Sequence, residues 1–150
     1  MAMTLVPHLS VGEMAPEFSL TGIDGRPVRL ADYRGRFLVV DFWATWCEPC
    51  VAQVPALKAA VKELTADPRF AVVGMSLDES AAPVTAFAGE HGVTWPQALL
   101  TNQWSSEVAK AYSVRSVPSL WLIGPDGKVI AKDLTVETLV DAVRAAMRAK

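Results

Sequence analysis

The only two cysteines of this chain lie three positions apart, and this pair constrains the fold more than any other feature. They close the run Asp-Phe-Trp-Ala-Thr-Trp-Cys-Glu-Pro-Cys at residues 41–50. Residues 37–44 are rich in β-branched and aromatic side chains, which predicts a buried strand, and apolar residues recur at helical spacing over 51–61. The two cysteines therefore fall where a strand turns into a helix.

A helix N-terminus favours negative charge through its free amide groups and its dipole, so a thiol placed there ionises more readily than a free one. We expect Cys47 to be the nucleophile, and Cys50, one turn further in, to resolve the mixed disulfide. Pro49 suits the first helical turn, where its missing N–H costs little and its fixed φ stiffens the geometry between the sulfurs. Glu48 should be exposed, and its charge tunes thiolate formation rather than catalysing the reaction.

Together with Pro55 and the downstream pair Val117-Pro118, this run resembles the thioredoxin-fold proteins, and within them the TlpA/ResA-type thiol-disulfide oxidoreductases. Residues 15–35 are typical of that group and of its peroxiredoxin relatives, and the resemblance covers roughly residue 11 to the C-terminus. It implies an α/β, thioredoxin-like fold with a central mixed β-sheet flanked by helices and an N-terminal β-hairpin extension.

Length and composition fit one domain over residues 1–150, with residues 1–10 as a loose N-terminal segment. The net charge is -2, from 14 Lys and Arg against 16 Asp and Glu, without a long basic run, so nucleic acid is not an expected partner. Two cysteines cannot build a disulfide framework, and one Cys-x-x-Cys pair supplies only half of a structural zinc site. We therefore expect redox chemistry with no metal and no organic cofactor.

The first ten residues lack a positive segment and a usable apolar stretch, and no run approaches the ~18 apolar residues of a membrane helix. As written, the chain is expected to be cytoplasmic, a monomer and not stably inserted in a membrane. The TlpA/ResA-type proteins that it resembles commonly work outside the cytoplasm behind a leader or anchor. A periplasmic or other extracytoplasmic location therefore remains the alternative.

The rest of the chain alternates strand and helix signals. Turn residues at 22–25 predict an N-terminal hairpin, and the apolar run at 70–77 predicts a second buried strand, parallel to the first. Further patterns predict the following: a helix from Ser80 to about 90, a short strand or loop at 95–100, a helix near 105–112, a hairpin of 119–123 with 128–131, and a last helix after Thr135.

Asp41 stands six positions before Cys47 in an otherwise apolar strand, which matches the buried aspartate of thioredoxins, whereas TlpA/ResA relatives more often carry Asn. Burial should raise its pKa and make it a candidate acceptor for the Cys50 proton, unless backbone hydrogen bonds merely hold the carboxyl. Gly74 replaces the lysine that partners this aspartate in many thioredoxins. Gln53 stands where ResA-like relatives carry glutamate, and an amide cannot relay protons.

The resemblance places a cis bond at Val117-Pro118, facing the cysteines. Such a bond would leave the Val117 backbone free to pair with an extended substrate segment, while the alternative is an ordinary proline at a strand edge. Trp43 and Trp46 flank the site as candidates for an apolar docking rim, although large aromatic side chains more often belong to the core, and Trp46 is the better candidate for exposure. The predicted substrate-binding residues are Trp46, Glu48, Pro49, Val117 and Pro118.

The predicted function is that of a dithiol-disulfide oxidoreductase. Its partners would be disulfide-containing protein substrates and an upstream electron donor, either a reductase or a membrane thiol donor, and the resemblance implies the reductive direction. A thiol-dependent peroxidase is one alternative, because residues 15–35 are shared with peroxiredoxins, although Ala44 stands where those carry Thr or Ser. The other alternative is a thioredoxin-like binding module with idle cysteines.

Overall fold

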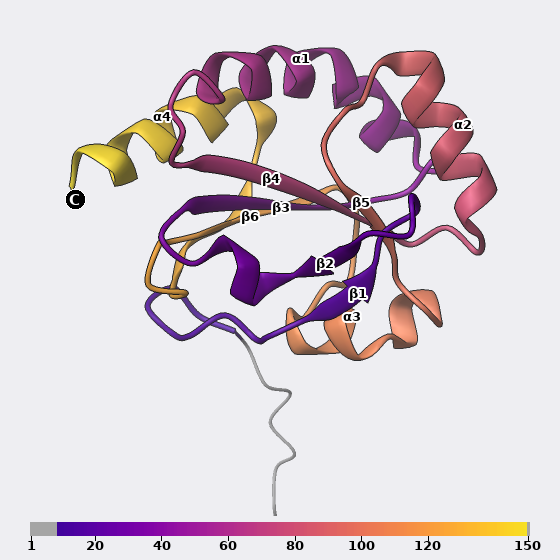
Figure 1. Cartoon of the computed structure of the whole chain (residues 1–150), viewed down its shortest axis with the longest axis horizontal. Coiled ribbons are helices and arrows are strands. Elements are labelled where there is room, and N and C mark those ends of the chain that lie inside the picture. The colour runs from indigo at the N-terminus through magenta and orange to yellow at the C-terminus, as the bar shows by residue number, and fades with distance from the viewer. Residues whose placement is uncertain (1–8, 150) are drawn as a thin grey trace, which may run out of the picture.

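The computed structural model describes residues 9–149, and its centre is a five-stranded mixed sheet in the order β5-β4-β3-β6-β7 (Figure 1). Strands β3, β4 and β5 run parallel to one another, while β6 is antiparallel to β3 and β7 is antiparallel to β6. The strands are β3 (Phe37–Trp43), β4 (Phe70–Ser76), β5 (Gln97–Leu99), β6 (Ser119–Ile123) and β7 (Val129–Leu134).

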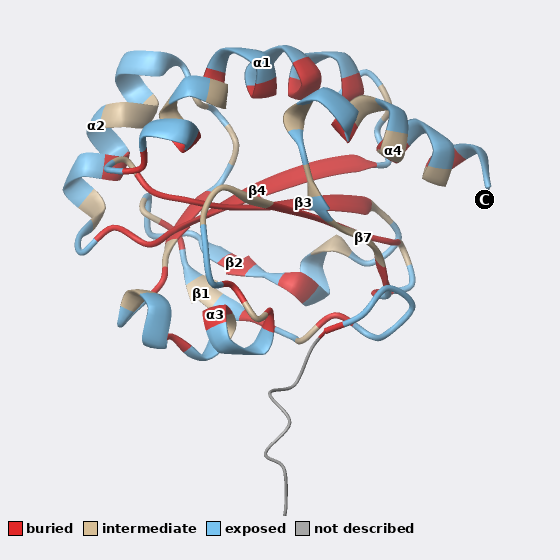
Figure 2. Ribbon diagram, turned by 180° about the vertical axis from the view of Figure 1, so that it is seen from behind, coloured by how far each residue is buried: buried red, intermediate tan, exposed pale blue. Residues whose placement is uncertain are grey.

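Helices cover both faces of this sheet. Figure 1 shows α1 (Glu48–Leu64), α2 (Ala81–His91) and α4 (Val136–Arg148) on one side, with α3 (Glu107–Ala111) on the other. Short 3₁₀ turns lie at Leu30–Tyr33, labelled η1, and at Gln103–Ser105, labelled η2. The sheet therefore has an apolar core on each face, and β3 and β4 are buried along their whole length (Figure 2). This double burial explains why both strands read as continuous apolar runs.

The predicted N-terminal hairpin is confirmed. Strands β1 (Ser19–Thr21) and β2 (Pro27–Arg29) pair antiparallel, and the turn between them includes Gly25 at φ 84°. The hairpin lies beside the edge strand β5, because Gly22 forms a bridge with Ala98 and the Ile23 N–H donates to the Gln97 carbonyl at 2.8 Å. The mixed sheet flanked by helices matches the expected architecture.

One boundary differs from the sequence predictions. The helix expected near 105–112 is a 3₁₀ turn followed by α3, because Ser106 breaks the run and caps α3 by accepting the Ala109 N–H. Residues 1–8 of the expected loose segment lie outside the described residues. Leu9 is buried, and its carbonyl accepts a hydrogen bond from Lys132 Nζ at 2.9 Å. Between residues 9 and 149, no helix has the length and apolar character needed to cross a membrane.

Candidate active site

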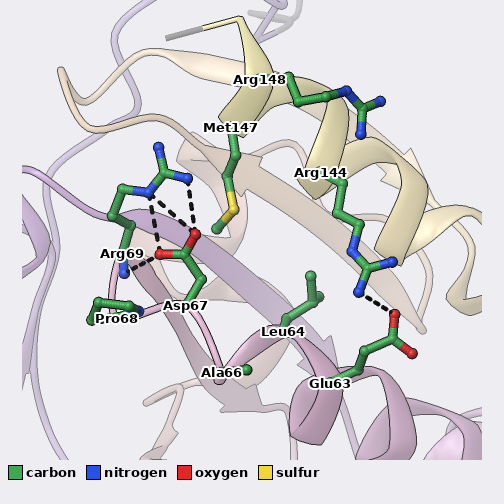
Figure 3. A pocket seen from close by; sticks show the side chains of 9 residues that line it. All are labelled: Glu63, Leu64, Ala66, Asp67, Pro68, Arg69, Arg144, Met147 and Arg148. Carbon is green, nitrogen blue, oxygen red and sulfur yellow. Dashed lines mark hydrogen bonds and ion pairs between the residues drawn. The ribbon is translucent and has the colours of Figure 1, made fainter.

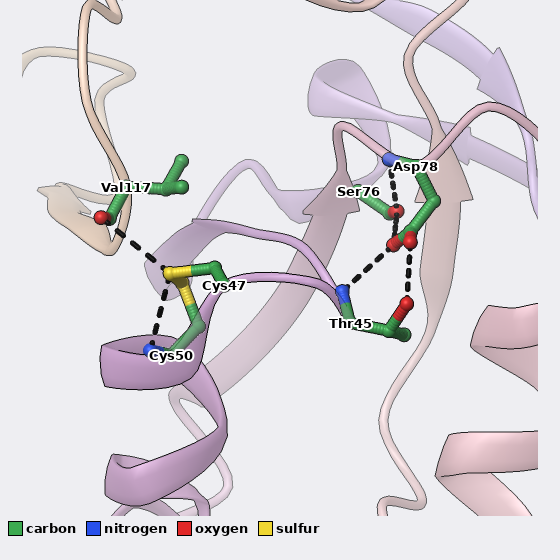
Figure 4. The surroundings of a disulfide bond; sticks show 6 residues. All are labelled: Thr45, Cys47, Cys50, Ser76, Asp78 and Val117. Atoms are coloured by element: carbon green, nitrogen blue, oxygen red, sulfur yellow. Dashed lines mark hydrogen bonds between the residues drawn. A yellow bond between two sulfur atoms is a disulfide. The ribbon is translucent and has the colours of Figure 1, made fainter.

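The turn from β3 into α1 brings the two cysteines together. Cys47 is the N-cap of α1, Pro49 lies in the first turn, and a disulfide links Cys47 to Cys50 (Figure 4). The backbone N–H of Cys50 donates to Cys47 Sγ at 3.2 Å. An amide donor and a helix N-terminus both stabilise negative charge on a sulfur atom. In the reduced protein this geometry favours a thiolate at Cys47.

Exposure separates the two sulfurs in the expected order. The relative exposure of Cys47 is 6%, against 1% for Cys50. The residues around Cys47 that were expected at the surface, Trp46, Glu48 and Pro49, are all exposed. An incoming disulfide therefore meets Cys47 first, while Cys50 faces the interior of the protein.

The loop before β6 lies against the disulfide. The carbonyl oxygen of Val117 is 3.6 Å from Cys47 Sγ, and the Val117-Pro118 bond is cis, as the resemblance implied. Among the described residues, no backbone-to-backbone hydrogen bond uses the amide or carbonyl of Val117. Within the described residues, the Val117 amide and carbonyl thus lack a backbone partner, and the carbonyl lies beside the reactive sulfur.

Asp41 is buried in the middle of the sheet, with a relative exposure of 4%. It shares the face of β3 with Phe37 and Val39, which pack against α1 and α4, and its strand neighbours are Gly74 and Leu120. Burial raises the pKa of Asp41 from its ordinary 3.8 to about 7, and Oδ1 accepts no hydrogen bond within the described chain. The predicted direction of the pKa shift is confirmed.

The prediction that Trp43 contributes to an apolar docking rim is wrong. Trp43 is buried because it ends a fully buried strand, and its ring lies 5.3 Å from that of Phe87 in α2. Its indole N–H donates to Gln97 Oε1 at 2.8 Å. The Gln97 amide occupies the space where a side chain at position 74 would begin, so the structure requires glycine there. Gln97 therefore fills the space beside Asp41 that a lysine at position 74 would need.

Asp78 is a buried residue of the site that the sequence reasoning missed. Its carboxylate accepts hydrogen bonds from the Thr45 N–H at 3.0 Å, from the Thr45 hydroxyl and from the Ser76 hydroxyl (Figure 4). It thus ties the loop before Cys47 to the end of β4. The signal that could have identified it is an acidic residue directly after a continuous apolar run.

Trp104, in η2, is a second residue that the sequence reasoning missed. Trp46 has a relative exposure of 56% and Trp104 of 40%, and their ring centroids are 6.4 Å apart. A large aromatic residue within the polar run 101–107 was the available signal. Two exposed tryptophans therefore lie in contact next to the reactive cysteine.

A separate hollow of about 500 Å³ lies at the opposite end of α1, between that helix, the start of β4 and α4 (Figure 3). Four of its charged side chains form two ion pairs, Arg69 with Asp67 at 2.8 Å and Arg144 with Glu63 at 2.7 Å. No cysteine lines it. This hollow takes no part in the redox site.

The sequence profile of the AhpC/TSA family matches residues 11–132. The chain belongs to this family. Among curated members, the thiol-disulfide oxidoreductase ResA of Bacillus subtilis strain 168 is 34% identical over 122 residues, which cover 81% of this chain and 66% of ResA. The chain thus spans about two thirds of that relative.

Solved structures show the same fold. A thiol-disulfide oxidoreductase from Bacteroides fragilis is 31% identical, with a TM-score of 0.81 over 89% of this chain and 98% of that one. The thioredoxin domain of a thiol-disulfide oxidoreductase from Bacteroides vulgatus is 28% identical, with a TM-score of 0.83 over 91% and 97% of the two chains. The thioredoxin-like fold and the resemblance to ResA-type AhpC/TSA proteins are confirmed.

Proposed function

We propose that this protein is a thiol-disulfide oxidoreductase that reduces disulfides in protein substrates. The observation that carries the proposal is the Cys47-Cys50 disulfide at the N-terminus of α1, with Cys47 the more exposed sulfur and the Cys50 N–H aimed at it. The relatives support the proposal, because ResA and the two Bacteroides proteins carry the name thiol-disulfide oxidoreductase.

The reaction begins with both cysteines reduced. The Cys47 thiolate attacks one sulfur of the substrate disulfide, forming a mixed disulfide and releasing the other substrate sulfur as a thiolate. The Cys50 thiolate then attacks Cys47 Sγ, which breaks the mixed disulfide and frees the second substrate thiol. Two electrons and two protons pass to the substrate, and the Cys47-Cys50 disulfide remains. A donor dithiol must reduce that disulfide before the next cycle.

The open backbone of Val117 is the proposed guide for the substrate chain. An extended segment that pairs with the Val117 amide and carbonyl lies alongside Cys47, because that carbonyl oxygen is 3.6 Å from Cys47 Sγ. Pro118 continues this edge, and the exposed residues Trp46, Glu48 and Pro49 lie directly before and after Cys47 in the chain. Substrate recognition then depends mainly on backbone shape, which suits proteins of varied sequence.

Asp41 is the proposed acceptor for the Cys50 proton. Its carboxyl lies on the sheet face that α1 covers, and a pKa of about 7 leaves it partly ionised at neutral pH. A group with such a pKa can take up a proton and return it without a large energy change. The alternative acceptor is water, and the two differ in what Asp41→Asn does to the second step.

The test is reduction of insulin disulfides with a small dithiol as the electron donor. Wild type should accelerate the reaction and Cys47→Ser should not. The same samples test the rivals: a peroxidase would consume peroxide faster than it reduces insulin, and a binding module would do neither. The upstream donor, the monomeric state and the location, cytoplasmic or extracytoplasmic, stay predictions.

A further inference from the structure

The sequence neighbours of the exposed tryptophans Trp46 and Trp104 are held by hydrogen bonds to the two residues that follow β4. Asp78 holds the backbone of Thr45, next to Trp46, and the carbonyl of Leu77 accepts a hydrogen bond from Gln103 Nε2 at 3.1 Å, next to Trp104. The pair is an exposed apolar surface near Cys47, and hydrogen bonds to the two residues that follow β4 anchor the neighbours of both rings.

The segment that presents Trp104 has an unusual backbone. Asn102, Gln103 and Ser113 adopt left-handed conformations with φ of 66°, 51° and 53°. Residues other than glycine hold this conformation at a cost of about 1–3 kcal/mol each, and such strain gathers at functional sites. Such residues lie at both ends of the short η2–α3 segment that carries Trp104, and Asp133 in β7 has a similar φ of 53°.

A surface hollow of about 560 Å³ begins at Trp104 and extends along α3 to Arg115. Lys110 and Arg115 are the charged residues that line it, both are exposed, and no acidic residue lines it. Within residues 9–149, neither cation forms an ion pair. The hollow is thus positively charged, although the net charge of the chain is -2.

Two residues that line the hollow link it to the redox site. Trp104 contacts Trp46, the neighbour of Cys47, and Arg115 stands two residues before Val117, whose carbonyl faces Cys47 Sγ. A chain that pairs with Val117 and crosses the tryptophan pair therefore carries its next side chains past Lys110 and Arg115. Those side chains meet an apolar floor between two cations.

We propose that this hollow, with the Trp46–Trp104 pair as its wall, is a binding subsite for an acidic segment of the substrate protein that flanks the attacked cysteine. The subsite rests on the proposed function and adds a substrate class to it. Acidic side chains gain attraction to both cations, and the apolar parts of the segment are buried against the tryptophan rings.

The test uses two disulfide-linked peptides that are identical except for the residues flanking one cysteine, which are glutamates in one and lysines in the other. The measurement is the second-order rate constant at which each peptide oxidises the reduced protein, followed by acid quenching and chromatography. Wild type should react with the acidic peptide about tenfold faster at low salt, and the ratio should approach one in about 1 M salt.

The double variant Lys110→Glu with Arg115→Glu should reverse this preference. Its matched control is Lys62→Glu with Arg148→Glu, which changes the net charge equally at the far end of α1 and α4 and should keep the wild-type ratio. Because the readout is a ratio, damage to folding lowers both rates and leaves it unchanged. Glu48 is present in every variant and does not affect the comparison. Trp104→Ala should slow both peptides, and Trp104→Phe should restore most of the rate.

Equal rates for the two peptides in wild type overturn the subsite and leave the proposed function standing. The subsite is also overturned if the double variant Lys110→Glu with Arg115→Glu keeps the wild-type ratio of the two rates. It is overturned as well if the control variant changes that ratio by the same factor as the double variant. Absence of oxidation by either peptide and by insulin is a different result, because it contradicts the proposed function itself.

Discussion

Replacing Asp41 by asparagine should make the stability of the protein depend differently on pH. Burial raises the pKa of Asp41 from 3.8 in its ordinary state to about 7 in the folded protein. Between these values the folded protein keeps a proton that the unfolded chain has lost. The free energy of unfolding therefore falls as pH rises through this window, and above pH 7 the full penalty applies.

The size of the penalty follows from the shift. A difference of about three pKa units, at about 1.4 kcal/mol each, gives an upper estimate of about 4 kcal/mol. Asn keeps the shape of the side chain but cannot ionise. Asp41→Asn should therefore be more stable than wild type by up to about 4 kcal/mol at pH 8, and the difference should fall below about 1 kcal/mol near pH 4, where wild-type Asp41 is protonated in the folded state and roughly half protonated in the unfolded chain.

The assay is urea unfolding of the oxidised proteins at a series of pH values, with the disulfide intact throughout. Other carboxylates titrate in both proteins and cancel in the difference. Asp141→Asn, which changes an exposed residue of α4, controls for the substitution itself. If the free energies of unfolding of Asp41→Asn and wild type differ by the same amount at pH 4 and pH 8, the argument is refuted, because burial would then not raise the pKa of Asp41.

Four further predictions concern the chemistry of the site. In single-turnover kinetics, Asp41→Asn should slow resolution of the mixed disulfide by about 10²-fold and slow the first attack less, and unchanged resolution would favour water as the proton acceptor. In the reduced, folded protein, mass spectrometry should find Cys47 alkylated faster than Cys50 at neutral pH, and equal labelling would contradict the assigned roles. Reduction of the disulfide should change the tryptophan emission of wild type, because Trp46 adjoins the disulfide, and an identical spectrum for both redox states would contradict this. The emission of Cys47→Ser should not change when reductant is added. Asp78→Ala should lower the free energy of unfolding by about 3 kcal/mol and narrow the difference between the two alkylation rates, whereas unchanged rates would show that the loop needs no anchor.

Local patterns were enough to predict the elements around the site. The apolar run at 37–43, the turn residues at 22–25 and the helical spacing after Cys50 each act within a few residues of sequence, and all three predictions are confirmed. The direction of the Asp41 pKa shift could also be predicted, because a carboxyl inside a buried strand is removed from water. The order of exposure of the two cysteines also followed from their positions in a helical turn.

The missed features depend on contacts between distant segments. Asp78 accepts hydrogen bonds from Thr45, 33 residues away, and Trp104 joins the site only because the fold brings it against Trp46. Trp43 was misjudged for the same reason, since its partner Gln97 lies 54 residues downstream. Nearness to Cys47 in sequence suggested a rim, but alternation along β3 and the cover of α2 decided that this ring is buried.

The central claim is that Cys47 attacks a substrate disulfide and Cys50 resolves the product, and trapping the intermediate tests it most directly. Reduced Cys50→Ser should form a mixed disulfide with insulin through Cys47, visible by mass spectrometry as an adduct that dithiothreitol removes. Cys47→Ser should form no such adduct under the same conditions. An adduct on Cys50 in Cys47→Ser, or no adduct on Cys47 in Cys50→Ser, would contradict the account.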